Sequence, residues 1–293
     1  MMKFPAVIGV CLMIFNRCAE GKYQPRALTK EQCENMTDDE CERRDRDLMG
    51  QNQQRKLVVN SQGFLNILVI PLKWKDTPAS RTLPTVETLN ELWNGVGVSD
   101  NIPSGSIANY THVNSHGNLK LNATVVDWIE ADNTEIYYAA GRSGAPNGNA
   151  PGTVQLEDVV FYALQQLANT GFDFTPFDQN NDVIIDAVSV LHSGYASEMG
   201  VTDCSNGRGQ LDRIHSQEDV AAVPRYFGPY GYMLGSYTIA SAFDGSCHSK
   251  LAGIGIITHE FIHLFGMPEL YDVAGPYTNS GCCVGGLGAY DIM

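Results

Sequence analysis

Two histidines, His259 and His263, stand four residues apart in this chain of 293 residues. On an α-helix, residues with this spacing lie one turn apart on the same face, so both imidazoles can reach one metal ion. Glu260 follows the first histidine, where its carboxylate would flank the metal and could take a proton from a water at that metal. This HExxH pattern predicts a catalytic zinc site. The alternative is a buried helix that carries polar residues by chance.

The residues after His263 predict a turn that brings a third ligand towards the metal. Gly266 can adopt the left-handed conformation that ends a helix, and Pro268 prevents the helix from resuming. The first side chain after this turn that can bind a metal is Glu269, and Asp272 is its rival. Two imidazoles and one carboxylate leave a fourth position open for water, which suits a catalytic Zn²⁺.

The segment 259–272, H-E-F-I-H-L-F-G-M-P-E-L-Y-D, is followed near the end of the chain by G-L-G-A-Y-D-I-M. Together the two segments resemble the immune inhibitor A family of secreted zinc metallopeptidases. The resemblance implies a zincin-like α/β fold, a twisted mixed sheet with an HExxH active-site helix. It also implies these roles: zinc ligation by His259, His263 and Glu269, general base catalysis by Glu260, and a place in the methionine turn beneath the metal for Met293.

The chain departs from the family pattern in two places. The acid after the proline is more often Asp in the family, whereas here it is Glu269. Relatives continue beyond the position of Met293, so we expect the catalytic domain to be truncated at its C-terminus. A donor near the metal must stabilise the oxyanion that forms during hydrolysis. Tyr290 and Tyr271 are the candidates for this donor.

Composition limits the class of protein and its partners. A chain of 293 residues with 43% hydrophobic content can bury a full globular core. The net charge of −14 argues against nucleic acid or an anionic membrane as a partner. The acidity also fits a secreted protein that binds Ca²⁺. The expected partner is a protein or peptide substrate.

The N-terminal residues predict export from the cell. Residues 1–20 combine Lys3, a short apolar run and small residues near a cleavage point, as in a secretory signal peptide. The apolar run is too short to span a bilayer, so we expect no membrane span. Residues 21–56 are polar and are expected to form a propeptide or linker. Residues 57–293 are then the zinc metallopeptidase catalytic domain, in a secreted, extracellular protein.

Hydrophobic periodicity predicts a mixed sheet backed by helices. The expected strands are 64–72, 119–129 and 183–191. The expected helices are 85–93, 106–114, 151–168 and 251–265, the last of which carries the two histidines. Residues 195–250 give the least informative pattern and are expected to be rich in loops.

Oxygen ligands recur in the loop before the third expected strand, at Asp178, Asn180, Asp182 and Asp186. This pattern predicts Ca²⁺ binding. The alternative is a plain Asx-rich turn. The loop is not an EF-hand, because Val183 and Ser189 stand where an EF-hand has its sixth-position Gly and twelfth-position Glu.

The cysteines predict disulfides, as is typical outside the cell. Cys33 and Cys41 are expected to pair with each other, and the alternative is that one thiolate caps the zinc in a latent zymogen. Two further disulfides are expected to join the remaining cysteines of the domain, Cys204 and Cys247 with Cys282 and Cys283. Two adjacent cysteines would be strained as a mutual pair, so either connectivity of these four is compatible with the sequence.

The sequence therefore predicts a secreted zinc endopeptidase with Glu260 as its general base. The alternative is a non-catalytic zinc-containing binding module or an inactive fragment. His112 and His116 are also four residues apart, but no acid follows His112, so we expect both on the surface. His192, His215 and His248 are expected to be structural or surface residues.

Overall fold

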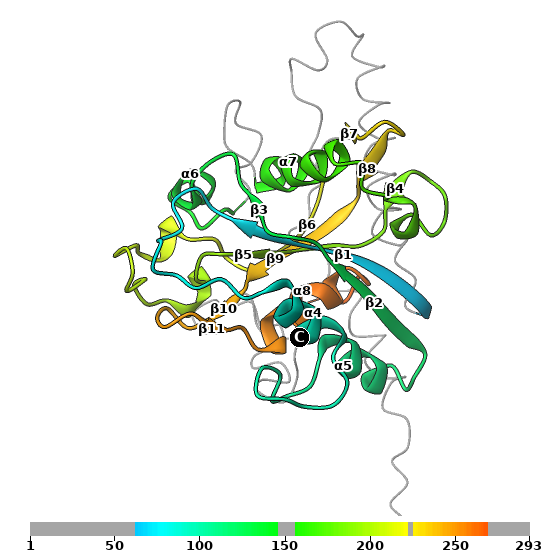
Figure 1. Cartoon of the computed structure of the whole chain (residues 1–293), viewed down its shortest axis with the longest axis horizontal. Helices are drawn as coiled ribbons and strands as arrows, with labels where there is room; N and C mark the ends of the chain where they lie inside the picture. The colour runs from blue at the N-terminus through cyan, green and yellow to red at the C-terminus, as the bar shows by residue number, and fades with distance from the viewer. Residues whose placement is uncertain (1–61, 146–155, 222–224, 269–293) are drawn as a thin grey trace, which may run out of the picture. The chain divides into compact units, whose positions relative to one another are not determined.

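The computed structural model describes residues 62–145, 156–221 and 225–268. These residues form a six-stranded mixed sheet with helices on both faces (Figure 1). The strand order is β2-β1-β5-β9-β6, and β3 pairs with β1 beyond the end of β2. The strands are β1 (Gly63–Lys73), β2 (Leu119–Val125), β3 (Ile129–Glu130), β5 (Val188–His192), β6 (Gln217–Val220) and β9 (Ser236–Ser241). The predicted mixed sheet is confirmed.

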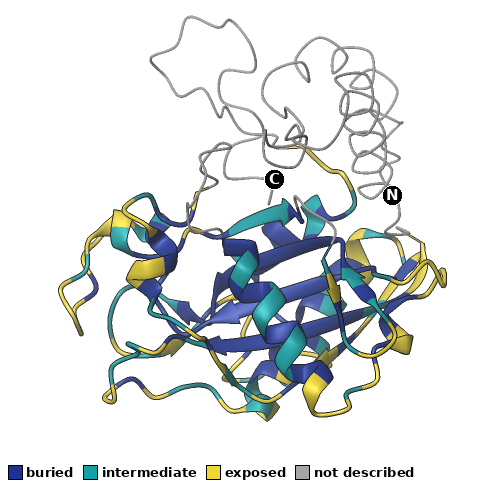
Figure 2. Cartoon of the chain, turned by 90° about the horizontal axis from the view of Figure 1, so that it is seen from above, coloured by how far each residue is buried: buried dark blue, intermediate teal, exposed yellow. Residues whose placement is uncertain are grey.

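Parallel pairing dominates the centre of the sheet. β1 pairs in parallel with β2 and β5, and β5 pairs in parallel with β9. β6 pairs antiparallel with β9, which makes the sheet mixed. All residues of β5 and β9 are buried, because helices cover both faces of this part of the sheet (Figure 2).

One face of the sheet carries α7 (Leu156–Asn169), whose buried Val160 and Leu164 share a core with Val190 of β5. The other face carries α4 (Val86–Asn94) and α8 (Ile254–His263), while α5 (Ile107–Asn114) packs on β2 (Figure 1). The sheet therefore separates two hydrophobic cores, and α8 lies on the face opposite α7.

The remaining elements are short. They are α6 (Glu135–Ala139), η2 (Thr175–Phe177), β4 (Ile184–Ile185), η3 (Ser197–Met199), η4 (Gln210–Asp212), β7 (Tyr226–Phe227), β8 (Tyr232–Leu234), β10 (Phe243–Asp244) and β11 (Lys250–Leu251). A three-stranded sheet has the order β4-β8-β7, and β10 and β11 form an antiparallel pair. No helix in the described ranges is both long and apolar enough to cross a membrane.

Two predicted helices begin at the caps that the sequence indicates. The Thr85 hydroxyl accepts a hydrogen bond from the backbone N–H of Thr88 at 3.2 Å, and α4 ends at Gly95. The Ser106 hydroxyl accepts from the backbone N–H of Asn109 at 3.1 Å and starts α5. Helix 151–168 is confirmed from Leu156 onwards, and its predicted first turn lies outside the described residues.

Two of the predicted strands are interrupted. The strand expected at 119–129 divides into β2 and β3, because the chain bends between them and the Trp128 side chain turns to donate a hydrogen bond to the Pro84 carbonyl at 2.8 Å. The strand expected at 183–191 is also wrong as a single element. β4 pairs with β8 in the small sheet, and β5 joins the main sheet. Asp186 separates them, and its backbone N–H donates to the Phe177 carbonyl at 2.8 Å.

The segment expected to be mainly loop contains a central strand. β9 has the sequence S-Y-T-I-A-S, and all six of its residues are buried. One of its hydroxyl groups is matched across the sheet, in the 2.9 Å hydrogen bond from Thr238 Oγ1 to Ser189 Oγ. Small and hydroxylated residues hid this strand from a pattern search for apolar runs.

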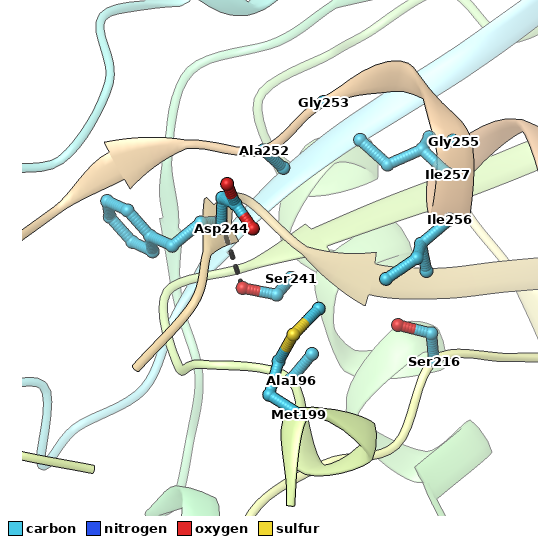
Figure 3. A pocket seen from close by; sticks show the side chains of 11 residues that line it. Ala196, Met199, Ser216, Ser241, Asp244, Ala252, Gly253, Gly255, Ile256 and Ile257 are labelled. Atoms are coloured by element: carbon cyan, nitrogen blue, oxygen red, sulfur yellow. Dashed lines mark hydrogen bonds between the residues drawn. The ribbon is translucent and has the colours of Figure 1, made fainter. Parts of the chain in front are cut away.

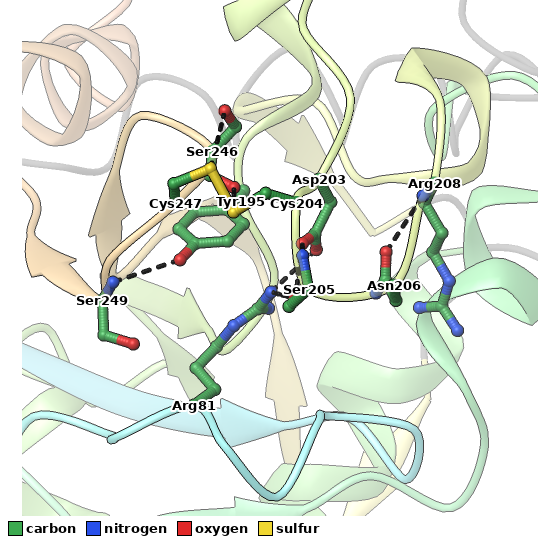
Figure 4. The surroundings of a disulfide bond; sticks show 10 residues. All are labelled: Arg81, Tyr195, Asp203, Cys204, Ser205, Asn206, Arg208, Ser246, Cys247 and Ser249. Atoms are coloured by element: carbon green, nitrogen blue, oxygen red, sulfur yellow. Dashed lines mark hydrogen bonds and ion pairs between the residues drawn. A yellow bond between two sulfur atoms is a disulfide. The ribbon is translucent and has the colours of Figure 1, made fainter.

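The expected pairing of Cys204 and Cys247 with the C-terminal cysteines is wrong, because these two residues form a disulfide with each other (Figure 4). Their Cα atoms are 5.6 Å apart. The backbone N–H of Cys204 donates to the Ser246 carbonyl at 3.2 Å, so two loops far apart in sequence run side by side here. The predicted partners Cys282 and Cys283 lie outside the described residues, as do Cys33 and Cys41.

Candidate metal centre

α8 is held against the sheet by one apolar stripe. Ile257, Phe261 and Leu264 are buried at spacings of three and four residues. The Phe261 ring meets the Trp93 ring edge to face, with centroids 5.7 Å apart. α8 is shorter than the predicted helix 251–265, because its N-cap is Gly253. This anchoring leaves the face with the two histidines towards solvent.

The two predicted histidines lie together on the open face of α8. The ring centroids of His259 and His263 are 4.8 Å apart, and the ring planes are inclined by 82°. One ligand atom from each of His259, Glu260 and His263 lies within 4.8 Å of the others. Among the residues that the structure describes, this is the one group of three such side chains close enough to hold a metal ion.

A backbone carbonyl sets the tautomer of His263. Its Nδ1 lies 2.7 Å from the carbonyl oxygen of Met267. A carbonyl only accepts, so Nδ1 carries the proton, and Nε2 is the nitrogen with which this ring would bind a metal. Gly266 makes this contact possible, because its φ of +77° ends the helix and turns the chain back, as the sequence predicts.

The Glu260 carboxylate lies beside the histidine pair. Its Oε1 is 4.0 Å from Nε2 of His259, and only 9% of its side chain is exposed. A carboxylate in this position can exchange a proton with a water or substrate placed over the histidines. The third ligand expected at Glu269, or at its rival Asp272, lies outside the described residues, as do the candidate donors Tyr290 and Tyr271 and the methionine Met293.

The residues predicted to bind calcium make an Asx-rich turn. Asp178 accepts from the backbone N–H groups of Asp182 at 2.9 Å and Val183 at 3.0 Å. Asn180 Oδ1 accepts from the same N–H of Asp182 at 3.1 Å. Asp186 accepts from a backbone N–H of this loop at 2.7 Å. Local N–H groups therefore take up most of the oxygens that the sequence assigned to Ca²⁺.

The three carboxylates of this loop do not form a group of converging ligands, since among the described residues such a group of three lies only on α8. Burial raises the pKa of Asp186 to about 6, against the opposing effect of the hydrogen bond from the Gln179 backbone N–H. The described contacts give no support to calcium here, and they match the alternative of a plain turn.

A buried charged cluster, which no local sequence pattern predicts, lies where β1 and β5 end. Glu135 is 1% exposed, and Arg208 bridges it at 3.3 Å and also pairs with Asp76. Burial raises the pKa of Glu135 to about 7, despite the opposing effect of Arg208. A Cβ atom at Gly194 would lie 2.0 Å from Glu135 Oε1, so this contact requires glycine. The three charged partners come from distant parts of the chain, which explains why spacing could not reveal them.

The other histidines do not contribute to the α8 site. His192 is fully buried, and its Nδ1 accepts from Trp74 Nε1 at 3.3 Å and from the Gly194 backbone at 3.1 Å. Burial lowers the pKa of His192 to about 3, so its ring is neutral and structural. His112, His116, His215 and His248 are exposed, as the sequence predicts.

The sequence model described as immune inhibitor A peptidase M6, catalytic domain, matches residues 93–287. The chain belongs to the immune inhibitor A family. The matched range includes His259, Glu260 and His263 as well as most of the sheet. The resemblance seen in the sequence is thereby confirmed, and the matched model is that of the family's catalytic domain.

Individual relatives in this family are distant. The chain is 25% identical over 191 residues to immune inhibitor A of Bacillus thuringiensis subsp. alesti. The aligned region covers 59% of this chain and 26% of that protein. It is 26% identical over 200 residues to pre-pro-metalloprotease PrtV of Vibrio cholerae serotype O1 (strain M66-2). This second aligned region covers 60% of this chain and 20% of that protein. The chain thus spans about a quarter or less of the length of these relatives.

Proposed function

We propose that this chain is a secreted, zinc-dependent endopeptidase with a zincin-like fold, in which α8 is the HExxH active-site helix. The observation that carries this proposal is the convergence of His259, Glu260 and His263 on the open face of α8, in a member of a metallopeptidase family. A non-catalytic zinc-binding module has no observation in its favour among the described residues, because both imidazoles and the adjacent carboxylate are present.

The donor set fits zinc better than other common metals. Neutral imidazoles are preferred ligands of Zn²⁺, whereas Ca²⁺ and Mg²⁺ select oxygen. The carbonyl of Met267 orients His263 and fixes its tautomer, which is the usual arrangement around a ligand histidine. We assign Glu269 as the third protein ligand, since it is the first acid after the turn at Gly266.

In this proposal, bound Zn²⁺ acts as a Lewis acid that lowers the pKa of water and polarises the peptide carbonyl. Glu260 takes a proton from the attacking water and passes it to the leaving amine. Only 9% of its side chain is exposed, which limits the access of bulk water to the carboxylate. Tyr290 or Tyr271 would donate a hydrogen bond to the oxyanion that develops on the carbonyl.

The proposed location is extracellular. Residues 1–20 would be the signal peptide, 21–56 a propeptide or linker, and 57–293 the catalytic domain. The Cys204–Cys247 disulfide supports export, because such bonds persist mainly in oxidising compartments. The exposure of Cys204 makes it accessible to cellular reductants if the protein stayed in a reducing compartment.

Cleavage of unfolded casein by the full chain, with and without chelator, tests this function. We expect cleavage to stop when the metal is removed and to return when zinc is added back, because the chemistry needs the ion. Magnesium added instead of zinc is the control and should restore nothing. Cleavage that continues at the parent rate after complete metal removal would exclude the proposal.

The assignment of Glu269 leads to a second test, the zinc content of single variants after dialysis. Glu269→Ala removes a charged ligand and should lower zinc affinity sharply, while Asp272→Ala should retain the metal. Glu269→Asp introduces the acid that is more common in the family. This variant should bind zinc if the backbone after Gly266 follows the same course as in the family. Loss of zinc from Asp272→Ala, with retention by Glu269→Ala, would transfer the role to Asp272.

A further inference from the structure

The chain contains three Asn-x-Thr sequences, which are the acceptor sequences for N-linked glycans: Asn35-Met-Thr, Asn109-Tyr-Thr and Asn122-Ala-Thr. Asn35 lies outside the described residues. Asn109 and Asn122 are both exposed, the first in the first turn of α5 and the second in β2. These two sites differ in how the side-chain amide is bonded and in what surrounds it.

The side-chain amide of Asn109 is available to carry a sugar. The backbone N–H of this residue donates to the Ser106 hydroxyl at 3.1 Å, and among the described residues its amide has no hydrogen-bond partner. The amide of Asn122, in contrast, donates to Asn66 Oδ1 at 2.8 Å, and the Asn66 amide donates in turn to the Pro176 carbonyl at 2.8 Å. A sugar on Asn109 therefore displaces no internal hydrogen bond.

Three strongly exposed valines lie around Asn109. Val96 is 100% exposed, Val98 is 73% exposed and Val113 is 61% exposed. Val113 follows Asn109 by four residues in α5, so the two side chains lie one turn apart on the same face of the helix. Single exposed apolar side chains are common on protein surfaces, but a group of them marks a surface that something else covers.

The loop that carries the other two valines reaches the Asn109 amide. A Cβ atom built on Gly105 would lie 3.3 Å from Asn109 Nδ2 and 3.6 Å from the carbonyl oxygen of Gly97. Gly97 stands between Val96 and Val98 in the sequence. Both valines therefore flank a residue that lies next to the amide.

Hydrogen bonds hold this loop, residues 95–105, in a defined conformation. The Glu91 carboxylate accepts from the Ser99 hydroxyl at 2.6 Å and from Asn101 Nδ2 at 2.8 Å. Ile102 anchors the loop from below, because its side chain is buried in the core with α4. The exposure of the valines thus belongs to an anchored loop, and it is costly unless their apolar surface is covered.

We propose that Asn109 carries an N-linked glycan whose first sugars cover Val96, Val98 and Val113. The inference rests on the export in the proposed function and is independent of the peptidase activity. The sugar rings would place C–H groups against the valines and hydroxyl groups towards water, so the glycan keeps this surface soluble.

The modification needs an oligosaccharide linked to a lipid pyrophosphate as its second reactant. Asn109 Nδ2 forms a bond to the anomeric carbon of the first sugar, and the bond from that carbon to the pyrophosphate oxygen breaks. The lipid pyrophosphate leaves with the electron pair, and a base of the transferase takes the proton from Nδ2. In the folded chain the Thr111 hydroxyl is buried and donates to the Ile107 carbonyl at 2.7 Å. Transfer therefore precedes the formation of α5.

The glycan would stand on a part of the chain that supplies neither the metal centre nor the pocket beside it. This pocket, with a volume of about 210 Å³, is lined by residues within 196–257, among them Met199, Phe243 and Ile256 (Figure 3). The three side chains of the metal centre all come from α8. The glycan can therefore be tested without reference to casein cleavage.

Mass spectrometry of the full chain made by eukaryotic cells tests the proposal. A signal sequence of the host is placed before the chain, and protein is recovered from the cells and from the medium. We expect a glycan on Asn109 in the parent and in Asn118→Gln, which makes the same change at an exposed asparagine outside an acceptor sequence. Asn109→Gln should be lighter than the parent by one whole glycan. An unmodified Asn109 in the parent would overturn the proposal.

A parallel expression that relies on residues 1–20 alone separates this result from the proposed export. If that protein stays in the cytosol while the host signal sequence yields a glycan on Asn109, the proposed export fails and the acceptor site stands. If both proteins leave the cell and Asn109 is unmodified in both, the export stands and the acceptor site fails.

Binding of the dye ANS to the folded proteins tests the covering of the valines. Asn109→Gln should bind more dye than the parent, because its valines are bare. In a Val96→Ser/Val98→Ser/Val113→Ser background, which should fold because all three positions are exposed, Asn109→Gln should cause no increase. Equal dye binding by the parent and Asn109→Gln, or the same increase in both backgrounds, would show that the glycan does not cover the valines.

Discussion

Glu260→Gln is expected to retain zinc and to lower kcat for peptide hydrolysis by about 10²- to 10⁴-fold, the usual contribution of general acid–base catalysis. Glutamine has nearly the same shape as glutamate but cannot take a proton from water or return one to the leaving amine. The side chain is only 9% exposed, so bulk solvent cannot easily replace its function. The metal should stay, because His259 and His263 are unchanged.

The control for this variant is Glu87→Gln, which makes the same chemical change at an exposed position in the first turn of α4. It should hydrolyse casein at the parent rate. Zinc content and the thermal unfolding midpoint, measured for both variants, exclude trivial causes of a loss. A Glu260→Gln protein that is folded, zinc-bound and as active as the parent would refute the role of Glu260 as general base.

The parts of the fold that depend on neighbouring residues could be predicted from the sequence. Thr85 and Ser106 cap their helices because a hydroxyl three residues before a free N–H suffices to bind it. The turn after α8 depends on Gly266, and the histidine pair depends on a spacing of four residues. In each case the physical cause lies within one or two turns of chain.

The features that sequence reasoning missed depend on distant partners. β9 is buried in the main sheet, but Ser and Thr residues alternate with its apolar ones and leave no apolar run to detect. Thr238 finds its partner, the Ser189 hydroxyl, on the neighbouring strand. Cys204 pairs with Cys247 because two loops run side by side, which the spacing of cysteines does not encode. The charges around Glu135 likewise come from three separate segments.

The acidic loop shows a different limit of sequence reasoning. Asp178 and Asp182 offer oxygens at the alternating spacing of a calcium loop, but the same oxygens also accept hydrogen bonds from backbone N–H groups in an Asx-rich turn. A calcium loop and an Asx-rich turn therefore use the same residue types. The fold decides between them: here these oxygens accept hydrogen bonds from local backbone N–H groups.

The second large effect is expected at the histidine pair itself. His259→Ala/His263→Ala removes both imidazoles from the open face of α8 and should abolish zinc binding, because the remaining carboxylates cannot replace two neutral nitrogen ligands. The core under α8 should survive, since Ile257, Phe261 and Leu264 are untouched. Casein cleavage should fall to the background rate together with the metal.

The chain offers a control matched in spacing, His112→Ala/His116→Ala, which changes two exposed histidines four residues apart with no acid after the first. Zinc per chain, measured by mass spectrometry after dialysis of the parent and of both double variants, tests the central claim most directly. We predict about one zinc in the parent and in the His112→Ala/His116→Ala protein, and none in the folded His259→Ala/His263→Ala protein. Equal zinc in all three proteins, or loss only from the control, would contradict the assignment of the metal centre to α8.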